Sequence, residues 1–396
     1  MNDLAFLLTT GLLILSPLHN NIITYRPQTK DRVVESLWIG VGSSLDPCGK
    51  EGLAHLYEHL VSWSLSGAQP LQVFAESQGV ELSAETGKDF ITFLLFGPQE
   101  QVKSVFQRLL KAASNPTLTA ELVEREKELM RQELMANEED AHWVLRSLLD
   151  TILFRQTGYA HPPTGWWESI QSLAPEDVRK FIERAKGAKV FRIRGAQNTL
   201  FYDDLTESLG TELVTKVHYC EPLLRRRKKT SGESGASLGW VFPCEGRDWA
   251  KWELLALALR ERLTQFLSTK REVRNWTLSL RPLRRQVVLS FTATTRSGLV
   301  DLPNGVLRVI RDLSDQSVPS SFVQQGIRTL LVDHRLKMVN PIEQVRLTGY
   351  GWALFDDPEW MVSYTESLKS VSPIEIQEFA RRLRERPPAI FVQPQR

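Results

Sequence analysis

Apolar and polar positions alternate along several short stretches of this chain and recur with a helical period along longer ones. In the first half this pattern predicts a strand over 33–42, a helix over 52–63, paired strands over 81–96 with a turn at Gly87-Lys88, helices over 99–113 and 119–154, and a strand over 189–194. Thr119 is the expected N-cap of the last helix, which contains neither Pro nor Gly. A sheet covered by helices is therefore expected.

The second half repeats this order. We expect a strand over 239–242, a helix over 249–267, strands over 276–295, helices over 305–313 and 320–336 with a continuation to about Leu354, a helix after Pro373 and a strand over 389–392. The segments 168–181 and 366–379 share Glu, Ser, Ser, Pro and Phe at a constant offset of 198 residues, half of the 396. Such an offset indicates two homologous halves.

The predicted fold class is therefore α+β, with two homologous domains that each consist of an antiparallel-rich β-sheet with helices packed on one side. We place the first domain at residues 1–216 and the second at 239–396. The basic run Arg225–Lys229 and the Ser- and Gly-rich residues after it lie between the two domains. Residues 217–238 are therefore expected to be a solvated linker.

Charge and hydropathy exclude several classes of partner. The 49 Lys and Arg residues nearly balance the 47 Asp and Glu residues, so no nucleic-acid partner is indicated. The apolar segment Leu4–Leu15 is too short to span a membrane, follows Asp3 rather than a basic residue, and is interrupted by Thr9, Thr10 and Gly11. We read it as an opening strand, and expect a cytoplasmic protein without a membrane partner.

Three cysteines, Cys48, Cys220 and Cys244, are scattered along the chain. Their odd number and wide spacing argue against a disulfide framework and do not match a zinc finger.

The segment Gly52–Leu60 contains the first candidate chemistry, with His55, Glu58 and His59 in the order of an inverted zinc-hydrolase motif. On a helix, His55 and His59 lie one turn apart on the same face and can bind one metal ion. Glu58 lies beside them, where a carboxylate can accept a proton from a water molecule. A catalytic zinc site needs a third protein ligand and one open position.

The third ligand is expected on the helix over 119–154. Glu126 and Glu133 lie seven residues apart on it, and therefore share one face. One of them can bind the metal while the other orients a ligand.

These residues resemble the pitrilysin and insulinase family of inverted-motif zinc peptidases, and in particular the short chains similar to mitochondrial processing peptidase subunits. The family has a ligand Glu some seventy residues after the motif, and Glu133 follows His59 by 74 residues. The resemblance implies that His55, His59 and Glu133 hold zinc, that Glu126 supports them and that Glu58 is the catalytic base. It further implies that an extended peptide lies along a sheet edge, with Ser83 and Ala84 as its closest contacts.

The second half departs from the family in two respects. Its equivalent helix, around Trp252–Arg260, contains no histidine. Family members that act alone carry an Arg and, seven positions later, a Tyr that stabilise the oxyanion, but Ser268 and either Asn275 or Trp276 occupy these positions here. Arg271 or Arg274 could compensate, although the register disfavours both. The missing pair points to a homologous partner subunit that supplies Arg and Tyr.

The predicted function is therefore that of a zinc-dependent endopeptidase, the catalytic subunit of a heterodimer that encloses its peptide substrate in a chamber. Processing of a specific precursor or leader peptide and degradation of small peptides both fit the sequence. Two alternatives remain: a stand-alone peptidase, or a structural subunit without activity, like some relatives in respiratory complexes. The intact set of His55, Glu58, His59 and Glu133 favours an enzyme.

Overall fold

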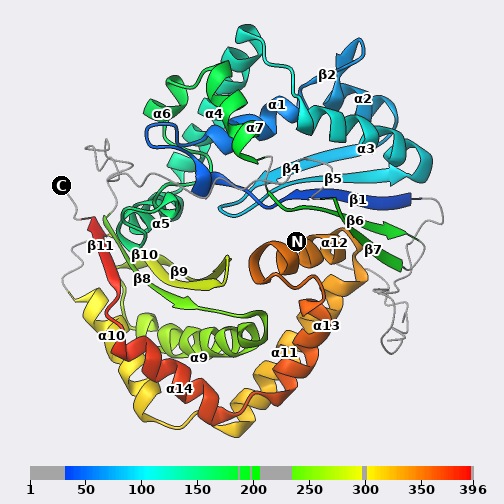
Figure 1. Ribbon diagram of the computed structural model, residues 1–396. Coiled ribbons are helices and arrows are strands. Elements are labelled where there is room, and N and C mark those ends of the chain that lie inside the picture. The colour runs from blue at the N-terminus through cyan, green and yellow to red at the C-terminus, as the bar shows by residue number, and fades with distance from the viewer. Residues whose placement is uncertain (1–31, 186–187, 197–198, 206–233, 297–300, 394–396) are drawn as a thin grey trace, which may run out of the picture.

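The computed structural model describes residues 32–185, 188–196, 199–205, 234–296 and 301–393 (Figure 1). The opening segment Leu4–Leu15 and most of the predicted linker lie outside these residues. The second predicted domain was placed at residue 239, but strand β8 already begins at Ser234, within the predicted linker.

The first half contains strands and helices in the predicted order. They are β1 (Arg32–Ile39), η1 (Ser43–Leu45), α1 (Leu53–Ser62), β2 (Leu65–Ser66), β3 (Gln69–Pro70), α2 (Leu71–Ser77), β4 (Glu81–Thr86), β5 (Ile91–Pro98), α3 (Gln99–Ser114), α4 (Ala120–Glu139), α5 (Ala141–Leu153), η2 (Gly158–Ala160), α6 (Trp167–Gln171), α7 (Pro175–Ala185), β6 (Val190–Ala196) and β7 (Thr199–Asp204).

The second half follows the same plan. Its elements are β8 (Ser234–Pro243), η3 (Gly246–Asp248), α9 (Trp249–Ser268), β9 (Val273–Leu283), β10 (Gln286–Thr295), α10 (Leu302–Asp315), α11 (Ser320–Val339), α12 (Pro341–Phe355), α13 (Trp360–Ser370), α14 (Pro373–Glu385) and β11 (Ala389–Gln393).

Each half folds around an antiparallel sheet, as the fold class predicts. The strand order is β4-β5-β1-β6-β7 in the first sheet and β11-β8-β10-β9 in the second. Read from β9, the second sheet repeats the order of the first, with β9, β10, β8 and β11 in the places of β4, β5, β1 and β6. The structure is therefore an α+β fold with an internal repeat.

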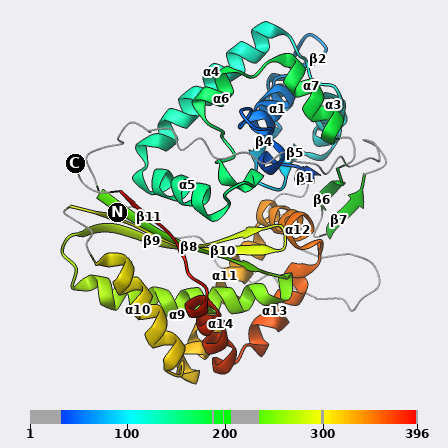
Figure 2. The same ribbon diagram turned by 60° about the vertical axis from the view of Figure 1, so that its left-hand side comes forward.

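Both sheets are covered on both faces, because each half lends one helix to the other. Helices α1, α3 and α7 lie above the first sheet in Figure 1, and α12 from the second half lies below it. In return, α5 of the first half packs on β8, β10 and β11 of the second sheet, whose other face is covered by α9 (Figure 2). Covering both faces explains why β1 is buried along seven of its eight residues.

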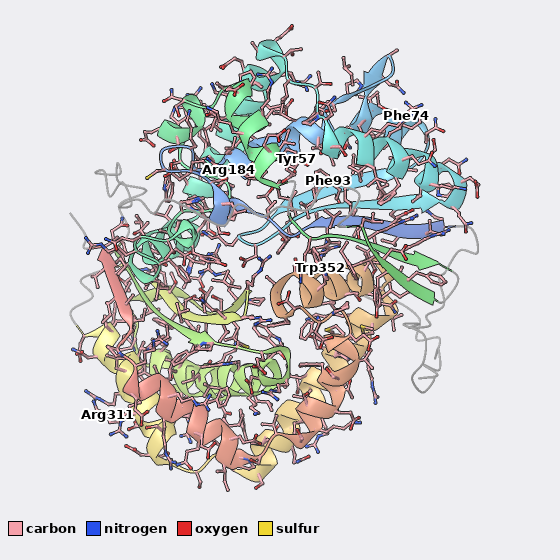
Figure 3. The ribbon with its side chains drawn as sticks, viewed as in Figure 1. Tyr57, Phe74, Phe93, Arg184, Arg311 and Trp352 are labelled. Carbon is pink, nitrogen blue, oxygen red and sulfur yellow. The ribbon has the colours of Figure 1, made fainter. Side chains whose placement is uncertain are left out.

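Glycine and tryptophan make this exchange possible. A Cβ atom at Gly349 of α12 would lie 2.0 Å from the ring of Trp38 on β1, so only glycine lets the helix approach this closely. Trp352 lies one turn further on (Figure 3) and stacks on Phe191 of β6 with the ring centroids 5.1 Å apart. On the other sheet, Gly239 of β8 leaves room for Leu149 of α5.

The prediction of one continuous helix over 119–154 is wrong, because the helix is interrupted. Asp140 has an extended backbone, with φ −82° and ψ 107°, and its carboxylate accepts a hydrogen bond from the backbone N–H of His142. It therefore ends α4 and caps α5. Asn340 does the same between α11 and α12. The expected N-cap at Thr119 is confirmed, since its side chain accepts from the backbone N–H of Leu122.

Cys48 takes part in a disulfide bond, whereas Cys244 is free and buried. One such bond is not a disulfide framework, so the expectation drawn from the scattered cysteines stays a prediction. Among the described residues, no helix combines the length and the apolar character that crossing a bilayer requires.

Candidate metal site

The motif helix α1 starts at a backbone turn that a buried carboxylate holds. Gly52 has φ 101°, a conformation that other residues rarely adopt. The Asp46 carboxylate accepts hydrogen bonds from the backbone N–H groups of Gly52 and Ala54, at 2.7 and 2.8 Å. Burial raises the pKa of Asp46 well above its usual value, and the two backbone N–H donors oppose that rise. This residue thus satisfies the free N–H groups at the start of α1.

His55, His59 and Glu133 come together between α1 and α4. Nε2 of His55 lies 3.4 Å from one carboxylate oxygen of Glu133, and Nε2 of His59 lies 3.6 Å from the other. A tetrahedral zinc ion with bonds of about 2.0–2.1 Å separates its ligand atoms by about 3.4 Å. The two nitrogens and the carboxylate therefore fit the donor set and the size of a zinc site, with room for one more ligand.

Glu126 contacts His59 from the side opposite Glu133. Its carboxylate lies 3.1 Å from Nδ1 of His59 and accepts two hydrogen bonds from the guanidinium of Arg125, at 2.6 and 2.8 Å. Glu126 is fully buried. This contact fixes the orientation of the imidazole and leaves Nε2 for a metal.

The protonation states reflect the same contacts. Burial disfavours the charged form of His59, but its contacts with Glu126 and Glu133 outweigh burial and raise its pKa to about 10. The hydrogen bond with His59 lowers the pKa of Glu133. Burial, with the nearby charge of His59, lowers the pKa of His55 to about 4. Without a metal, a proton on His59 therefore balances the carboxylates.

Glu58 lies at the edge of this group of ligands. Its carboxylate is 4.0 Å from Nε2 of His55, and burial raises its pKa to about 7. The hydroxyl of Thr86, the last residue of β4, donates a hydrogen bond of 2.8 Å to the same carboxylate oxygen. A base with a pKa near neutrality is suited to proton transfer at physiological pH.

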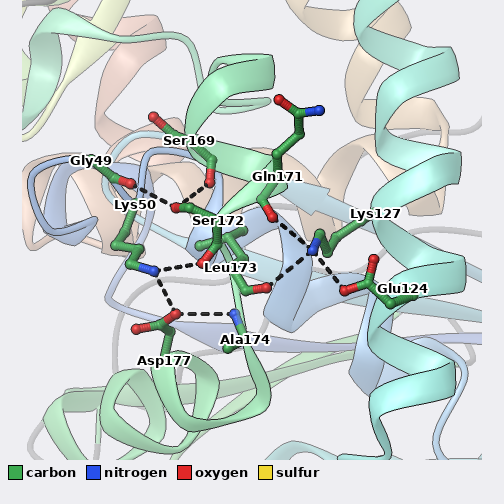
Figure 4. Close-up of polar contacts among 10 residues, drawn as sticks. All are labelled: Gly49, Lys50, Glu124, Lys127, Ser169, Gln171, Ser172, Leu173, Ala174 and Asp177. Atoms are coloured by element: carbon green, nitrogen blue, oxygen red, sulfur yellow. Dashed lines mark hydrogen bonds and ion pairs between the residues drawn. The ribbon is translucent and has the colours of Figure 1, made fainter.

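Two lysines hold the helices of the site in place (Figure 4). Lys127 of α4 is buried, and its ammonium binds Glu124 and the backbone carbonyls of Gln171 and Leu173. Lys50, just before α1, binds Asp177 of α7 at 2.8 Å. Helices α1 and α4 are thus both tied to the segment around α6 and α7, which fixes the distance between their ligands.

The predicted peptide contacts lie on an edge strand. Strand β4 pairs with β5 on one side only, which leaves its other edge open in the described sheet. Ser83 is exposed and Ala84 half-buried on this strand, three and two residues before Thr86. The positions are compatible with the predicted role, which stays a prediction.

The residues at the family's Arg and Tyr positions lie in the second half. Ser268 is the last residue of α9, where its hydroxyl donates to the carbonyl of Gln265, and Asn275 pairs with Thr294 between β9 and β10. The ring of Trp276 packs 6.1 Å from Phe291, on the core of the second sheet. Among the described contacts, none joins these three residues to the histidines or to Glu133.

Three supporting residues were not predicted from the sequence: Asp46, Thr86 and Lys127. Asp46 lies six residues before Gly52, far from the N-cap position at which a capping side chain is expected in a sequence. Thr86 donates a hydrogen bond to Glu58, 28 positions away. Lys127 donates one to the backbone of Gln171, 44 positions away. No local pattern marks such contacts.

Comparison with known sequences finds similarity in the first half. Residues 21–164 match the sequence profile described as Insulinase (Peptidase family M16). Over these residues the chain is similar to the insulinase (M16) family. Mitochondrial-processing peptidase subunit beta of Bos taurus is 23% identical over 190 residues, which cover 47% of this chain and 37% of that protein. The non-peptidase homolog YmxG of Helicobacter pylori is 25% identical over 154 residues, covering 38% of this chain and 34% of that protein.

The matches thus span just over a third of the length of these two relatives. Similarity of fold extends further. The crystal structure of a protease from Helicobacter pylori superposes with a TM-score of 0.75 at 13% identity and covers 94% of this chain and 96% of that one. At this identity the likeness concerns the fold alone. Because these relatives include a peptidase subunit and a non-peptidase homolog, the similarity does not by itself decide the activity.

Proposed function

We propose that the protein is a zinc-dependent endopeptidase. The observation that carries the proposal is the convergence of His55, His59 and Glu133, with their ligand atoms within 4.8 Å of one another, beside the buried carboxylate of Glu58. Zinc, when bound, acts as a Lewis acid on a peptide carbonyl and makes a water molecule more acidic. His55, His59 and Glu133 would hold it.

The chain's own residues would supply the proton transfer. Glu58 would accept a proton from the attacking water and deliver it to the leaving amine, since it is a base with a pKa of about 7. Thr86 would keep the Glu58 carboxylate turned towards the site through its 2.8 Å hydrogen bond. Glu126 and Arg125 would hold His59 in one orientation.

The open edge of β4 would bind the peptide. An extended peptide can add to an edge strand through backbone hydrogen bonds, which give affinity without demanding one sequence. Ser83 and Ala84 would be its nearest neighbours, and Thr86 would lead it to Glu58. The predicted substrate is therefore a peptide in extended conformation, such as a precursor or leader peptide.

A homologous partner subunit would complete the site. Ser268 and Asn275 cannot replace the cation and the phenol of the family's Arg and Tyr in stabilising an oxyanion. The relative named mitochondrial-processing peptidase subunit beta is, by its name, part of a larger assembly. A heterodimer whose second subunit brings Arg and Tyr would satisfy both observations.

The same two positions favour one competing function, that of a non-enzymatic subunit like the non-peptidase homolog among the relatives. Zinc content and peptide cleavage separate the two functions. We expect the purified chain, together with a homologue that carries Arg and Tyr, to hold one zinc ion and to cleave extended peptides, and Glu58→Gln to keep zinc while cleavage falls at least about 100-fold. A chain that binds no zinc, or cleavage that survives Glu58→Gln, would contradict the proposal.

A further inference from the structure

A cavity of about 450 Å³ opens beside the candidate metal site, between the two halves of the chain. Its wall is formed by residues of β4 and the following turn, of α5, of β9 and of α12. Thr86 belongs to this wall and also binds the carboxylate of Glu58, so the cavity begins one side chain away from the proposed base. A peptide that follows the edge of β4 past Thr86 would therefore lie over its mouth.

Most charged groups of the wall already have partners. Arg281 of β9 makes a bidentate ion pair with Asp150 of α5. The ammonium of Lys88 binds the backbone carbonyls of Tyr159 and His161, and Asp89 accepts hydrogen bonds from Tyr159 and from the backbone N–H of Arg284. These groups are held by the protein and have little capacity left for a ligand.

Two charged groups of the wall, Glu85 and Arg146, remain to be considered. The carboxylate of Glu85 lies on the exposed side and accepts a hydrogen bond from Tyr350 of α12, at 3.2 Å. Arg146 of α5 is half-buried, and in the described part of the chain its guanidinium makes no hydrogen bond and no ion pair of its own. Burial, and then the neighbouring charge of Arg281, lower its pKa, and the charges of Asp150 and Asp140 oppose that change. Arg146 is therefore a cation that no carboxylate of the described residues binds by a hydrogen bond.

A carboxylate is the group that would satisfy Arg146. A guanidinium offers planar pairs of N–H donors that match the two oxygens of a carboxylate. The wall also contains Trp143, Phe90, Pro162 and Pro163, which would pack against the methylene groups of a side chain and keep water away from the ion pair. The volume exceeds that of a single side chain and leaves room for water.

We propose that this cavity is a substrate subsite that accepts an acidic side chain, Asp or Glu, of a peptide bound along β4, and that Arg146 determines this specificity. This rests on the proposed peptidase function and adds the class of residue that the substrate carries near the cleaved bond. If the cavity instead bound a basic side chain through Glu85, the specificity would be the opposite of the one proposed.

Binding, rather than cleavage, tests the subsite. The full chain with Glu58→Gln, which would not consume the ligand, is titrated into fluorescein-labelled peptides of alanine and serine, and anisotropy gives the affinity. A single Glu is placed at each position of the peptide in turn, and the same is done with Gln and with Arg. At one position we expect Glu to bind roughly 10-fold more tightly than Gln, the size expected for a charge-assisted hydrogen bond.

Variants then assign the preference to one residue. Arg146→Gln should abolish the difference between Glu and Gln, and Arg146→Glu should make Arg the preferred residue at the same position. Arg131→Gln, which removes an Arg from the exposed face of α4 outside the cavity, is the matched control and should leave the preference unchanged. Zinc content and thermal midpoint show that each variant is folded.

Three results would overturn the subsite: no position that prefers Glu over Gln, a preference that survives Arg146→Gln, or a preference for Arg in the unaltered cavity. Failure of the proposed function is measured separately, as absence of cleavage by the chain with an intact Glu58 in the presence of a homologue that carries Arg and Tyr. A preference for Glu in binding can still hold in that case.

Discussion

Glu126 and His59 are in contact at 3.1 Å, through the ring nitrogen that does not face Glu133. The two carboxylates of α4 therefore have different tasks, although they lie seven residues apart on the same helix face. The oxygens of Glu133 lie near Nε2 of both His55 and His59, whereas Glu126 holds the imidazole of His59 in one orientation.

This difference predicts the zinc content of two variants. Glu133→Gln should lose zinc almost completely, because a neutral amide replaces one of three ligands. Glu126→Gln should keep the site but weaken zinc binding by roughly 10- to 100-fold, as expected when a residue that orients a ligand is changed. Metal analysis after dialysis against a graded chelator measures both. Equal zinc retention by the two variants would contradict these roles.

Thr86 provides a second prediction. Its hydrogen bond stabilises the charged form of Glu58, so Thr86→Val should raise the pKa of that carboxyl. Because a base must be deprotonated to work, the acidic limb of the kcat/KM profile should move to higher pH, and activity near neutrality should fall roughly 3- to 10-fold.

Thr86→Ser is the matched control, since it keeps the hydroxyl and should keep the profile of the unaltered protein. A Thr86→Val profile that superposes on that of the unaltered protein would show that the contact has no effect on Glu58.

The third prediction concerns a partner. Because Ser268 and Asn275 stand at the positions of the oxyanion-stabilising pair, the chain alone should hold zinc yet cleave peptides about 100- to 1,000-fold more slowly than with a homologue that supplies Arg and Tyr. Changing those two residues in the homologue should remove the gain without releasing zinc from this chain. Full activity of the isolated chain would instead assign the role to Arg271, Arg274 or Trp276.

Much of the fold and the site could be predicted because the signals are local. His55, Glu58 and His59 lie within one helical turn and a half, and the seven-residue spacing brings Glu126 and Glu133 to one face at any register of α4. The break at Asp140 was missed because no Pro or Gly marks it. Whether an Asp caps a new helix or continues the old one depends on the sheet that α5 packs against.

The cavity beside the site is a clearer case of a feature that sequence reasoning cannot reach. Asp150 and Arg281 are 131 residues apart, and Glu85 and Tyr350 are 265 residues apart. Each is an ordinary surface residue type in its own element. Only the crossing of α5 and α12 between the sheets brings these side chains together.

The buried imidazole of His161 should make the folding stability of the protein depend on pH. Burial lowers its pKa to about 3, below its ordinary value of about 6.5 in an unfolded chain. Between these values the unfolded chain binds a proton that the folded chain does not, so stability falls as the pH drops below about 6.5, by up to about 1.4 kcal/mol per pH unit.

His161→Leu should lose that contribution, because leucine does not titrate. Urea unfolding of both proteins between about pH 5 and pH 7 measures it as a shallower decline in the variant. The other histidines are common to both proteins, so the difference in slope belongs to His161. Parallel slopes would mean that the folded protein protonates this imidazole as readily as the unfolded chain does.

The exchange of α5 and α12 has a mechanical consequence. A hinge motion that separated the two halves would strip a helix from both sheets at once and expose apolar faces to water, so the chain should move and unfold as a single cooperative body. Neither half would be soluble when expressed alone. If a chamber has to open to admit peptide, the movement must then occur between one chain and the next, and the rate of that opening becomes a property of the assembly.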